Sequence, residues 1–90
     1  MESKEVQRSR KINRICEMVE RGSGVVFHNI AALDGNDVSF FDGAGQIEIL
    51  IENDNMKAGE EIPVTWKYFS DEALDEIVKI IHDSNYGITH

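Results

Sequence analysis

The fold is decided by residues 38–52, which read Val-Ser-Phe-Phe-Asp-Gly-Ala-Gly-Gln-Ile-Glu-Ile-Leu-Ile-Glu. Two runs rich in β-branched and aromatic residues flank a glycine-containing turn at residues 42–45, the pattern of a β-hairpin. In the second run Ile47, Ile49 and Ile51 alternate with polar residues, so they share one face of a strand. The stretch therefore predicts two antiparallel strands at residues 38–41 and 46–52.

Two further strands are predicted on either side of this hairpin. Residues 25–33 form a mostly apolar run that ends at Asp34-Gly35, a dipeptide that favours tight hairpin turns. Residues 62–69 form the fourth run, which follows a polar connection of nine residues, 53–61. Pro63 near its start cannot donate to a strand ladder, so this strand is expected at a sheet edge.

Helices are predicted at both ends of the chain. In residues 3–21, four apolar residues recur at helical spacing on one stripe: Ile12, Ile15, Cys16 and Val19. The first turns, residues 2–9, carry only Val6 as an apolar residue, and residues 1–8 are candidates for fraying. The second helix follows Ser70, a favourable N-cap, and its apolar arc consists of Ala73, Leu74, Ile77, Val78, Ile80 and Ile81.

The element order is α-β-β-β-β-α, which predicts an α+β fold. We expect residues 1–90 to form a single domain, a four-stranded antiparallel meander with an N-terminal and a C-terminal helix on one face, in two layers. One alternative stays open, in which each helix covers a different face and the fold has three layers.

The second face of the sheet is expected to carry apolar residues that no helix covers. Phe40 and Phe41 are adjacent and must point to opposite faces, and Leu50 and Phe69 alternate with the predicted core residues. We therefore expect Phe41, Leu50 and Phe69 to form an interface for a partner or for self-association into a homodimer. The alternative is a scatter of exposed apolar residues without a role. The register of the first strand stays open between two sets: Val25, Phe27, Asn29 and Ala31, or Val26, His28, Ile30 and Ala32.

Charge is distributed unevenly along the chain, whose formal net charge is −8. Residues 1–21 contain six basic and four acidic residues, a net +2, whereas residues 22–90 contain three lysines and thirteen acidic residues, a net −10. Such a division favours an electrostatically directed partner, or two copies of the chain that meet head to tail.

The first functional hypothesis uses the acidic part of the chain. We expect a small, non-enzymatic protein-binding module whose acidic surface engages a basic, nucleic-acid-binding partner, as an inhibitor or regulator that mimics the polyanion. The residues proposed for this surface lie on the third strand, the following loop and the second helix: Glu48, Glu52, Asp54, Glu60, Glu61, Asp71, Glu72, Asp75, Glu76 and Asp83. The alternative is that these charges only keep a small domain in solution.

The second hypothesis uses the basic first helix. Arg10, Arg14 and Arg21 lie on nearly the same side of this helix and could contact nucleic-acid phosphates. The net −10 of the rest of the chain would repel the same polyanion, and no aromatic residue on the helix offers a stacking surface. We therefore rank this hypothesis second, and a small enzyme third.

No motif in the sequence assigns catalytic, cofactor-binding or metal-binding residues. The single cysteine, Cys16, lies on the apolar stripe of the first helix, which favours a buried hydrophobe over a reactive thiol. His28, His82 and His90 are too far apart to form a local metal motif. The chain has no apolar run of the ~20 residues that span a bilayer and no signal-peptide pattern at its start. We therefore expect a cytoplasmic protein without a cofactor and without a membrane partner.

Overall fold

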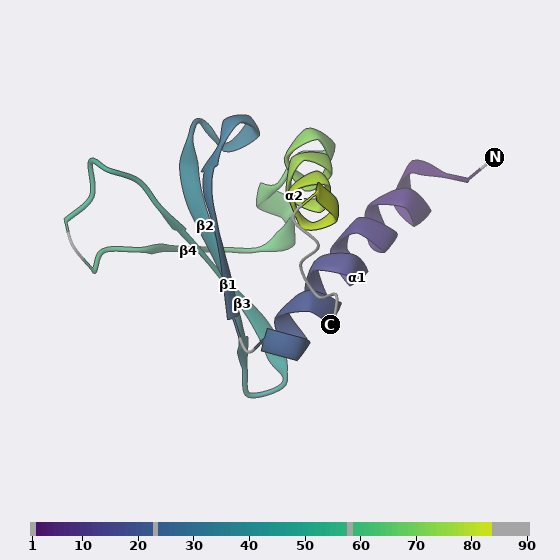
Figure 1. Ribbon diagram of the computed structural model, residues 1–90, viewed down its shortest axis with the longest axis horizontal. Helices are drawn as coiled ribbons and strands as arrows, with labels where there is room; N and C mark the ends of the chain where they lie inside the picture. The colour runs from purple at the N-terminus through teal and green to yellow at the C-terminus, as the bar shows by residue number, and fades with distance from the viewer. Residues whose placement is uncertain (1, 23, 58, 84–90) are drawn as a thin grey trace.

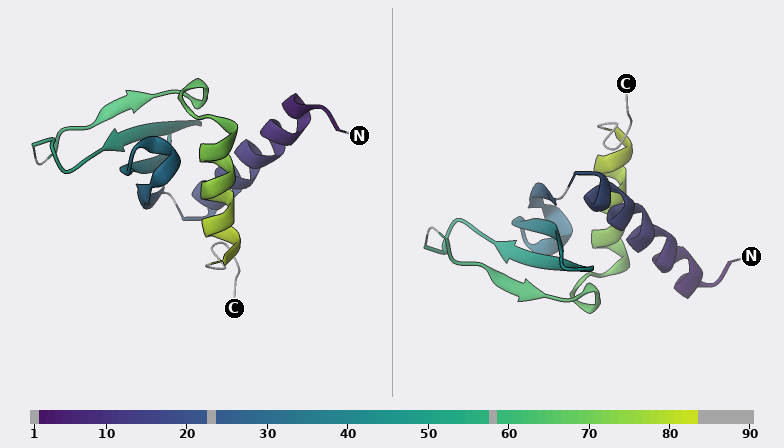
Figure 2. Two further views of the ribbon diagram at one scale, coloured as in Figure 1. Left: turned by 90° about the horizontal axis from the view of Figure 1, so that it is seen from above. Right: turned by 90° about the horizontal axis from the view of Figure 1, so that it is seen from below.

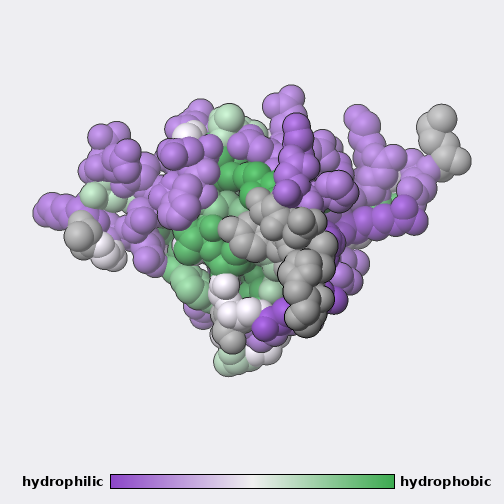
Figure 3. Space-filling view, in the orientation of Figure 1, coloured by the Kyte–Doolittle hydropathy of each residue, from purple (hydrophilic) through white to green (hydrophobic). Residues whose placement is uncertain are grey.

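Two helices lie on the same side of one antiparallel sheet in the computed structural model, which describes residues 2–22, 24–57 and 59–83 (Figures 1 and 2). The predicted α-β-β-β-β-α fold in two layers is confirmed. Hydrophobic residues gather between the sheet and α2 in the view of Figure 3, with hydrophilic residues around them. In chain order the elements are α1 (Lys4–Gly22), β1 (Gly24–Ile30), η1 (Ala31–Leu33), β2 (Asn36–Gly43), β3 (Gln46–Glu52), β4 (Ile62–Val64), η2 (Trp66–Tyr68) and α2 (Asp71–Asp83), where η denotes a 3₁₀ helix.

The sheet is a meander in which strands β1, β2, β3 and β4 lie side by side in sequence order. Strand β3 pairs with β2 over its full length, from Asp37 opposite Glu52 to Gly43 opposite Gln46. The two residues between them, Ala44 and Gly45, have φ angles of 48° and 87°. Positive φ at both positions is what a type I′ turn requires, and this turn matches the twist of a hairpin.

Phe40 of β2 lies at the centre of the core. Its ring centroid is 5.9 Å from that of Phe27, 5.5 Å from that of Trp66 and 5.8 Å from that of Phe69. The isoleucines Ile49 and Ile51 are buried beside it, as their alternation predicts. These side chains meet the apolar stripes of the two helices: Ile15, Met18 and Val19 of α1, and Ala73, Leu74, Ile77 and Ile81 of α2.

A β-bulge in β1 settles the register that the sequence left open. Phe27 pairs with Val38 and Ile30 pairs with Asn36, so His28 and Asn29 together lie opposite one residue of β2. The extra residue reverses the alternation, as bulges do. Val25 and Phe27 face the core before the bulge and Ile30 is buried after it. Each of the two competing sets is therefore correct for half of the strand.

The fourth strand is shorter than predicted, and this corrects the position of Phe69. β4 ends after Val64, and η2 occupies part of the predicted strand. The helical turn breaks the alternation, so Phe69 is buried in the core at 2% exposure and its neighbour Tyr68 is 47% exposed. The prediction that Phe69 lies on the second sheet face is therefore wrong.

Helix α2 begins where its predicted cap lies. The Ser70 hydroxyl accepts the backbone N–H of Ala73 at 3.1 Å, which satisfies one of the free donors of the first turn. Helix α1 starts at Lys4, inside the segment considered for fraying. Neither described helix is long and apolar enough to pass through a bilayer.

Candidate protein-interaction surfaces

The basic side chains of α1 contact the start of α2 and the turn before it. Arg8 donates from Nη2 to the carbonyl oxygens of Trp66 and Phe69 at 2.7 and 2.8 Å, and from Nη1 to Asp71 Oδ1 at 3.1 Å. One turn further along, Lys11 Nζ lies 2.6 Å from Asp75 Oδ1. The guanidinium group of Arg8 therefore holds three segments together: α1, η2 and α2.

The proposed nucleic-acid contacts Arg10, Arg14 and Arg21 lie elsewhere on α1. Arg10 is exposed and pairs with Glu2, with 2.5 Å between Nη2 and Oε2. Arg14 Nη1 is 3.9 Å from Glu17 Oε2, a long contact within the helix. Arg21 is exposed in the last turn. Both pairs reduce the positive charge that this face of α1 presents to a phosphate.

Several acidic residues of α2 have partners inside the molecule. Asp71 and Asp75 pair with α1. Glu76 accepts the backbone N–H groups of Ala31 and Ala32 at 2.8 and 3.0 Å, with one carboxylate oxygen each, and so caps η1. In the last turn Asp83 lies 3.5 Å from His82. Glu72 is exposed. The acidic row predicted on α2 is therefore divided by internal contacts rather than continuous.

The remaining predicted acidic residues belong to the sheet and to the loop before β4. Asp54, Glu60 and Glu61 are exposed in this loop, which lies at the far end of the β3–β4 arm in Figure 1. Glu48 and Glu52 belong to β3 and alternate with its buried isoleucines. They therefore project from the face of the sheet opposite the helices. We call this face the open face.

The open face carries a row of four residues, three of them apolar, that crosses all four strands. Val26, Ser39, Leu50 and Pro63 are direct neighbours in the strand register, and none of the described helices lies over them. Val26 is 39% exposed and Leu50 is half-buried. Next to this row Phe41 is 38% exposed and lies opposite Glu48. Of the three residues predicted for an apolar interface, Phe41 and Leu50 lie on this face and Phe69 does not.

Phe41 covers the glycine that lies opposite it on β1. A methyl group added at Gly24 would be 2.9 Å from Cδ1 of Phe41. A glycine in a strand leaves a gap that an aromatic ring from the neighbouring strand can cover. The ring of Phe41 is therefore held against the sheet at the position where β1 offers no side chain.

Asp37 stabilises the bulge and adds a third carboxylate to the open face. Its Oδ1 accepts the backbone N–H of Asn29 at 2.9 Å, and its Oδ2 lies 3.1 Å from His28 Nδ1. The hydrogen bond from Asn29, and next the one from His28, lower the pKa of the Asp37 carboxyl. Asn29 has a φ of 53°, an uncommon conformation outside glycine. Asp37 lies directly opposite Glu52, so two carboxylates are neighbours on adjacent strands.

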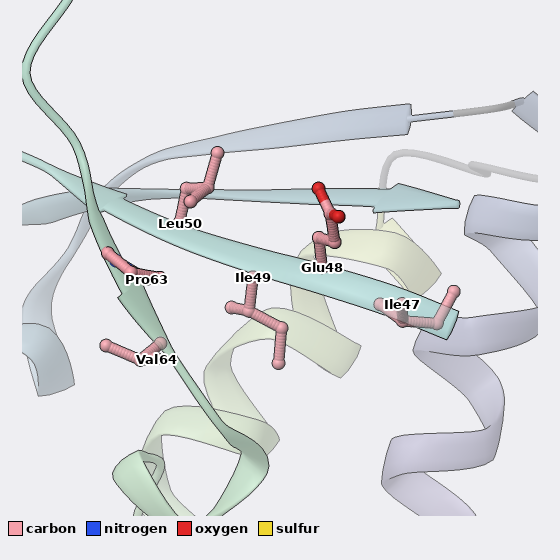
Figure 4. Close-up of a pocket in the computed structure, with 6 residues that line it drawn as sticks. All are labelled: Ile47, Glu48, Ile49, Leu50, Pro63 and Val64. Carbon is pink, nitrogen blue, oxygen red and sulfur yellow. The ribbon is translucent and has the colours of Figure 1, made fainter. Parts of the chain in front are cut away.

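A groove of about 380 Å³ lies where β4 leaves the edge of β3 (Figure 4). β4 pairs only with residues 49–51, so residues 46–48 of β3 have no neighbouring strand on that side among the described residues. Glu48 and Leu50 project to one side of β3 and Ile49 to the other. The groove is lined by five apolar residues and one carboxylate: Ile47, Ile49, Leu50, Pro63, Val64 and Glu48.

The open face was only partly predicted from the sequence. Val26 and Asp37 were not assigned to it, since their positions depend on the strand register. The four strands contain no lysine or arginine, but the sequence hid this signal because the predicted fourth strand, residues 62–69, included Lys67.

Other residues with potential chemistry are separate from these surfaces. Burial, and then the nearby charges of Glu20 and Glu17, raise the pKa of the Cys16 thiol, so it is protonated at neutral pH. Within the described ranges no three His, Cys, Asp or Glu side chains are grouped so that they could hold a metal ion. His90 lies outside the described residues.

Comparisons with protein-family models, with curated proteins and with solved structures found no match for this chain.

Proposed function

We propose that this protein is a small acidic, non-enzymatic protein-binding module that engages a basic partner protein as an inhibitor or regulator. The observation that carries the proposal is the distribution of charge in space. The cations Arg8 and Lys11 contact α2 and the turn before it, whereas the four strands carry carboxylates and no cation. A partner that approaches the sheet therefore meets negative charge and apolar surface together.

A basic nucleic-acid-binding protein is the partner class that this charge favours. Its binding surface is already complementary to a polyanion, and exposed carboxylates can occupy the positions that phosphates take. The protein would then compete with nucleic acid for the same surface. Cytoplasmic location and homodimer formation stay predictions from the sequence.

The alternative, direct binding of nucleic acid by α1, has less support. Arg8 and Lys11 contact α2, and Arg10 and Arg14 have acidic partners on their own segment. Each phosphate contact would require such a pair to open, and the acidic sheet would repel the same strand.

Affinity capture from the native cell extract tests the proposal. The tagged protein is used as bait at low and at high salt, with and without nuclease. We expect recovery of a basic nucleic-acid-binding protein that survives nuclease treatment and is lost at high salt, because screening weakens exposed charge pairs. Adding the protein should then release that partner from its nucleic acid. If the purified protein itself is retained on DNA or RNA at moderate salt, the proposal is wrong and the alternative is favoured.

A further inference from the structure

The open face offers a partner both apolar contact and fixed charge. Val26, Phe41 and Leu50 supply apolar surface on three neighbouring strands, and Pro63 extends it to the fourth. Asp37, Glu48 and Glu52 lie beside this row. Interfaces that bind specifically combine a dehydrated apolar centre with a polar rim. The arrangement on this sheet has both parts.

The side chains of this face are held in place before any partner arrives. The ring of Phe41 rests on Gly24, and the Asp37 carboxylate is fixed by Asn29 and lies against His28. Groups on strands that are already ordered lose little conformational entropy on binding. The face therefore differs from the loop at residues 53–57 and 59–61, whose acidic side chains are exposed without such contacts among the described residues.

We propose that the basic partner docks on the open face, with its cations on Asp37, Glu48 and Glu52 and an apolar centre on Val26, Phe41 and Leu50. This inference rests on the proposed function and names the surface that performs it. The negative charge of the open face determines which class of molecule can bind there. A second copy of this chain that docked through the same face would place carboxylates against carboxylates, and a nucleic acid would place phosphates against them. A basic protein surface is the complementary choice.

The groove between β3 and β4 takes one lysine or arginine side chain of the partner. The stem of such a side chain is apolar over most of its length and its end is charged. In the groove, Leu50, Pro63 and Val64 offer contact for the stem, and Glu48 offers a carboxylate for the charged end. A purely apolar side chain would leave Glu48 dehydrated without a cation, which is unfavourable.

The test uses three synthetic peptides and the full chain. The first peptide alternates lysine and leucine, the second is an oligolysine of equal charge, and the third alternates glutamate and leucine. Binding is followed by amide shifts of the ¹⁵N-labelled protein. We expect the lysine–leucine peptide to bind most tightly and to shift amides of β1, β2 and β3 rather than those of α2.

Charge-reversed variants locate the site. The double variant Glu48→Lys/Glu52→Lys should weaken binding of the lysine–leucine peptide by about tenfold or more. The control is Glu72→Lys on α2, which reverses one exposed charge where the double variant reverses two, and should alter the affinity by less than about twofold. Leu50→Ser should weaken the lysine–leucine peptide and leave oligolysine unchanged. Thermal unfolding of each variant confirms that it is folded, and the charge-neutral Glu48→Gln/Glu52→Gln replaces the double reversal if that variant does not fold.

The outcomes separate this inference from the function on which it rests. If the peptide binds but shifts α2 or the loop, or if Glu72→Lys weakens binding equally, the open face is the wrong surface while a basic partner remains supported. If neither lysine-containing peptide binds and affinity capture recovers no basic protein, both proposals fail. If the glutamate–leucine peptide binds as well as the lysine–leucine peptide, or if light scattering shows dimers that Leu50→Asp dissociates, the occupant is not a basic protein.

Discussion

The ring of Phe41 lies over Gly24 on the neighbouring strand, with its Cδ1 2.9 Å from where a glycine Cβ would be. The pair joins β1 to β2 on the face that carries the proposed interface. Gly24 therefore leaves the space that the Phe41 ring occupies, and the ring covers the sheet where β1 has no side chain.

Gly24→Ala should lower the free energy of unfolding by about 1 kcal/mol, because the added methyl group forces the Phe41 ring away from the sheet. The measurement is urea unfolding of a double-mutant cycle with Phe41→Ala. In the Phe41→Ala background the cost of Gly24→Ala should largely disappear, since the clashing ring is gone. Equal costs in both backgrounds would show that the two residues are not coupled.

Arg8→Ala should destabilise the fold by about 2 kcal/mol, since hydrogen bonds to charged groups contribute more than neutral ones and the two carbonyl oxygens of Trp66 and Phe69 would lose their donor. Arg8→Lys should recover only part of this loss, because an ammonium group cannot reproduce the guanidinium fork. The control is Arg10→Ala. Its exposed pair with Glu2 should contribute less than about 1 kcal/mol. A similar loss from both alanine variants in urea unfolding would contradict the assignment of Arg8 as the residue that joins α1 to α2.

Ala44→Asn should raise the free energy of unfolding by about 0.5–1 kcal/mol, because Ala44 has a φ of 48° and asparagine tolerates this left-handed conformation better. Ala44→Val tests the opposite direction, since a β-branched residue is strongly disfavoured at positive φ. Thermal or urea unfolding orders the three proteins. We expect Ala44→Asn to be the most stable, the parent to be intermediate and Ala44→Val to be the least stable. Equal stabilities would show that the turn adopts another conformation in solution.

The stability of the fold should fall in acid through Asp37. Its pKa is lowered in the folded protein, so the folded state binds fewer protons than the unfolded state as pH decreases toward this pKa. The contribution is complete above the ordinary aspartate pKa of 3.8 and is lost as pH falls through the lower pKa of the folded protein.

Urea unfolding at several pH values between about 2 and 6 measures how steeply the free energy of unfolding depends on pH. Asp37→Asn should be less stable than the parent at pH 6, and its stability should depend less on pH. The control Asp42→Asn changes an exposed carboxylate of the same strand. Its free energy of unfolding should depend on pH as that of the parent does, because Asp37 is retained. If the free energy of unfolding of Asp37→Asn depends on pH as steeply as that of the parent, other carboxylates cause the loss of stability in acid.

The arrangement of charge was predicted in part. The sequence showed a basic first helix and an acidic remainder, but not that Arg8 and Lys11 contact α2 and the turn before it. These contacts join residues about sixty positions apart, and no local spacing reports them. Likewise, Glu76 was assigned to a surface for a partner, whereas it caps η1 within the molecule.

The sequence by itself determined the elements whose patterns are local. Alternating isoleucines and a glycine turn specify the β2–β3 hairpin, and apolar stripes with a serine cap specify the helices, because these signals lie within a few residues of each other. Only the tertiary structure decided the bulge at His28 and Asn29, the turn at η2 and the resulting position of Phe69. Each depends on contacts with distant residues, such as Asp37 with Asn29 and Arg8 with the carbonyl oxygens of η2 and Phe69. A single inserted residue or helical turn reverses which side chains face the core, and that choice is made by packing rather than by local propensity.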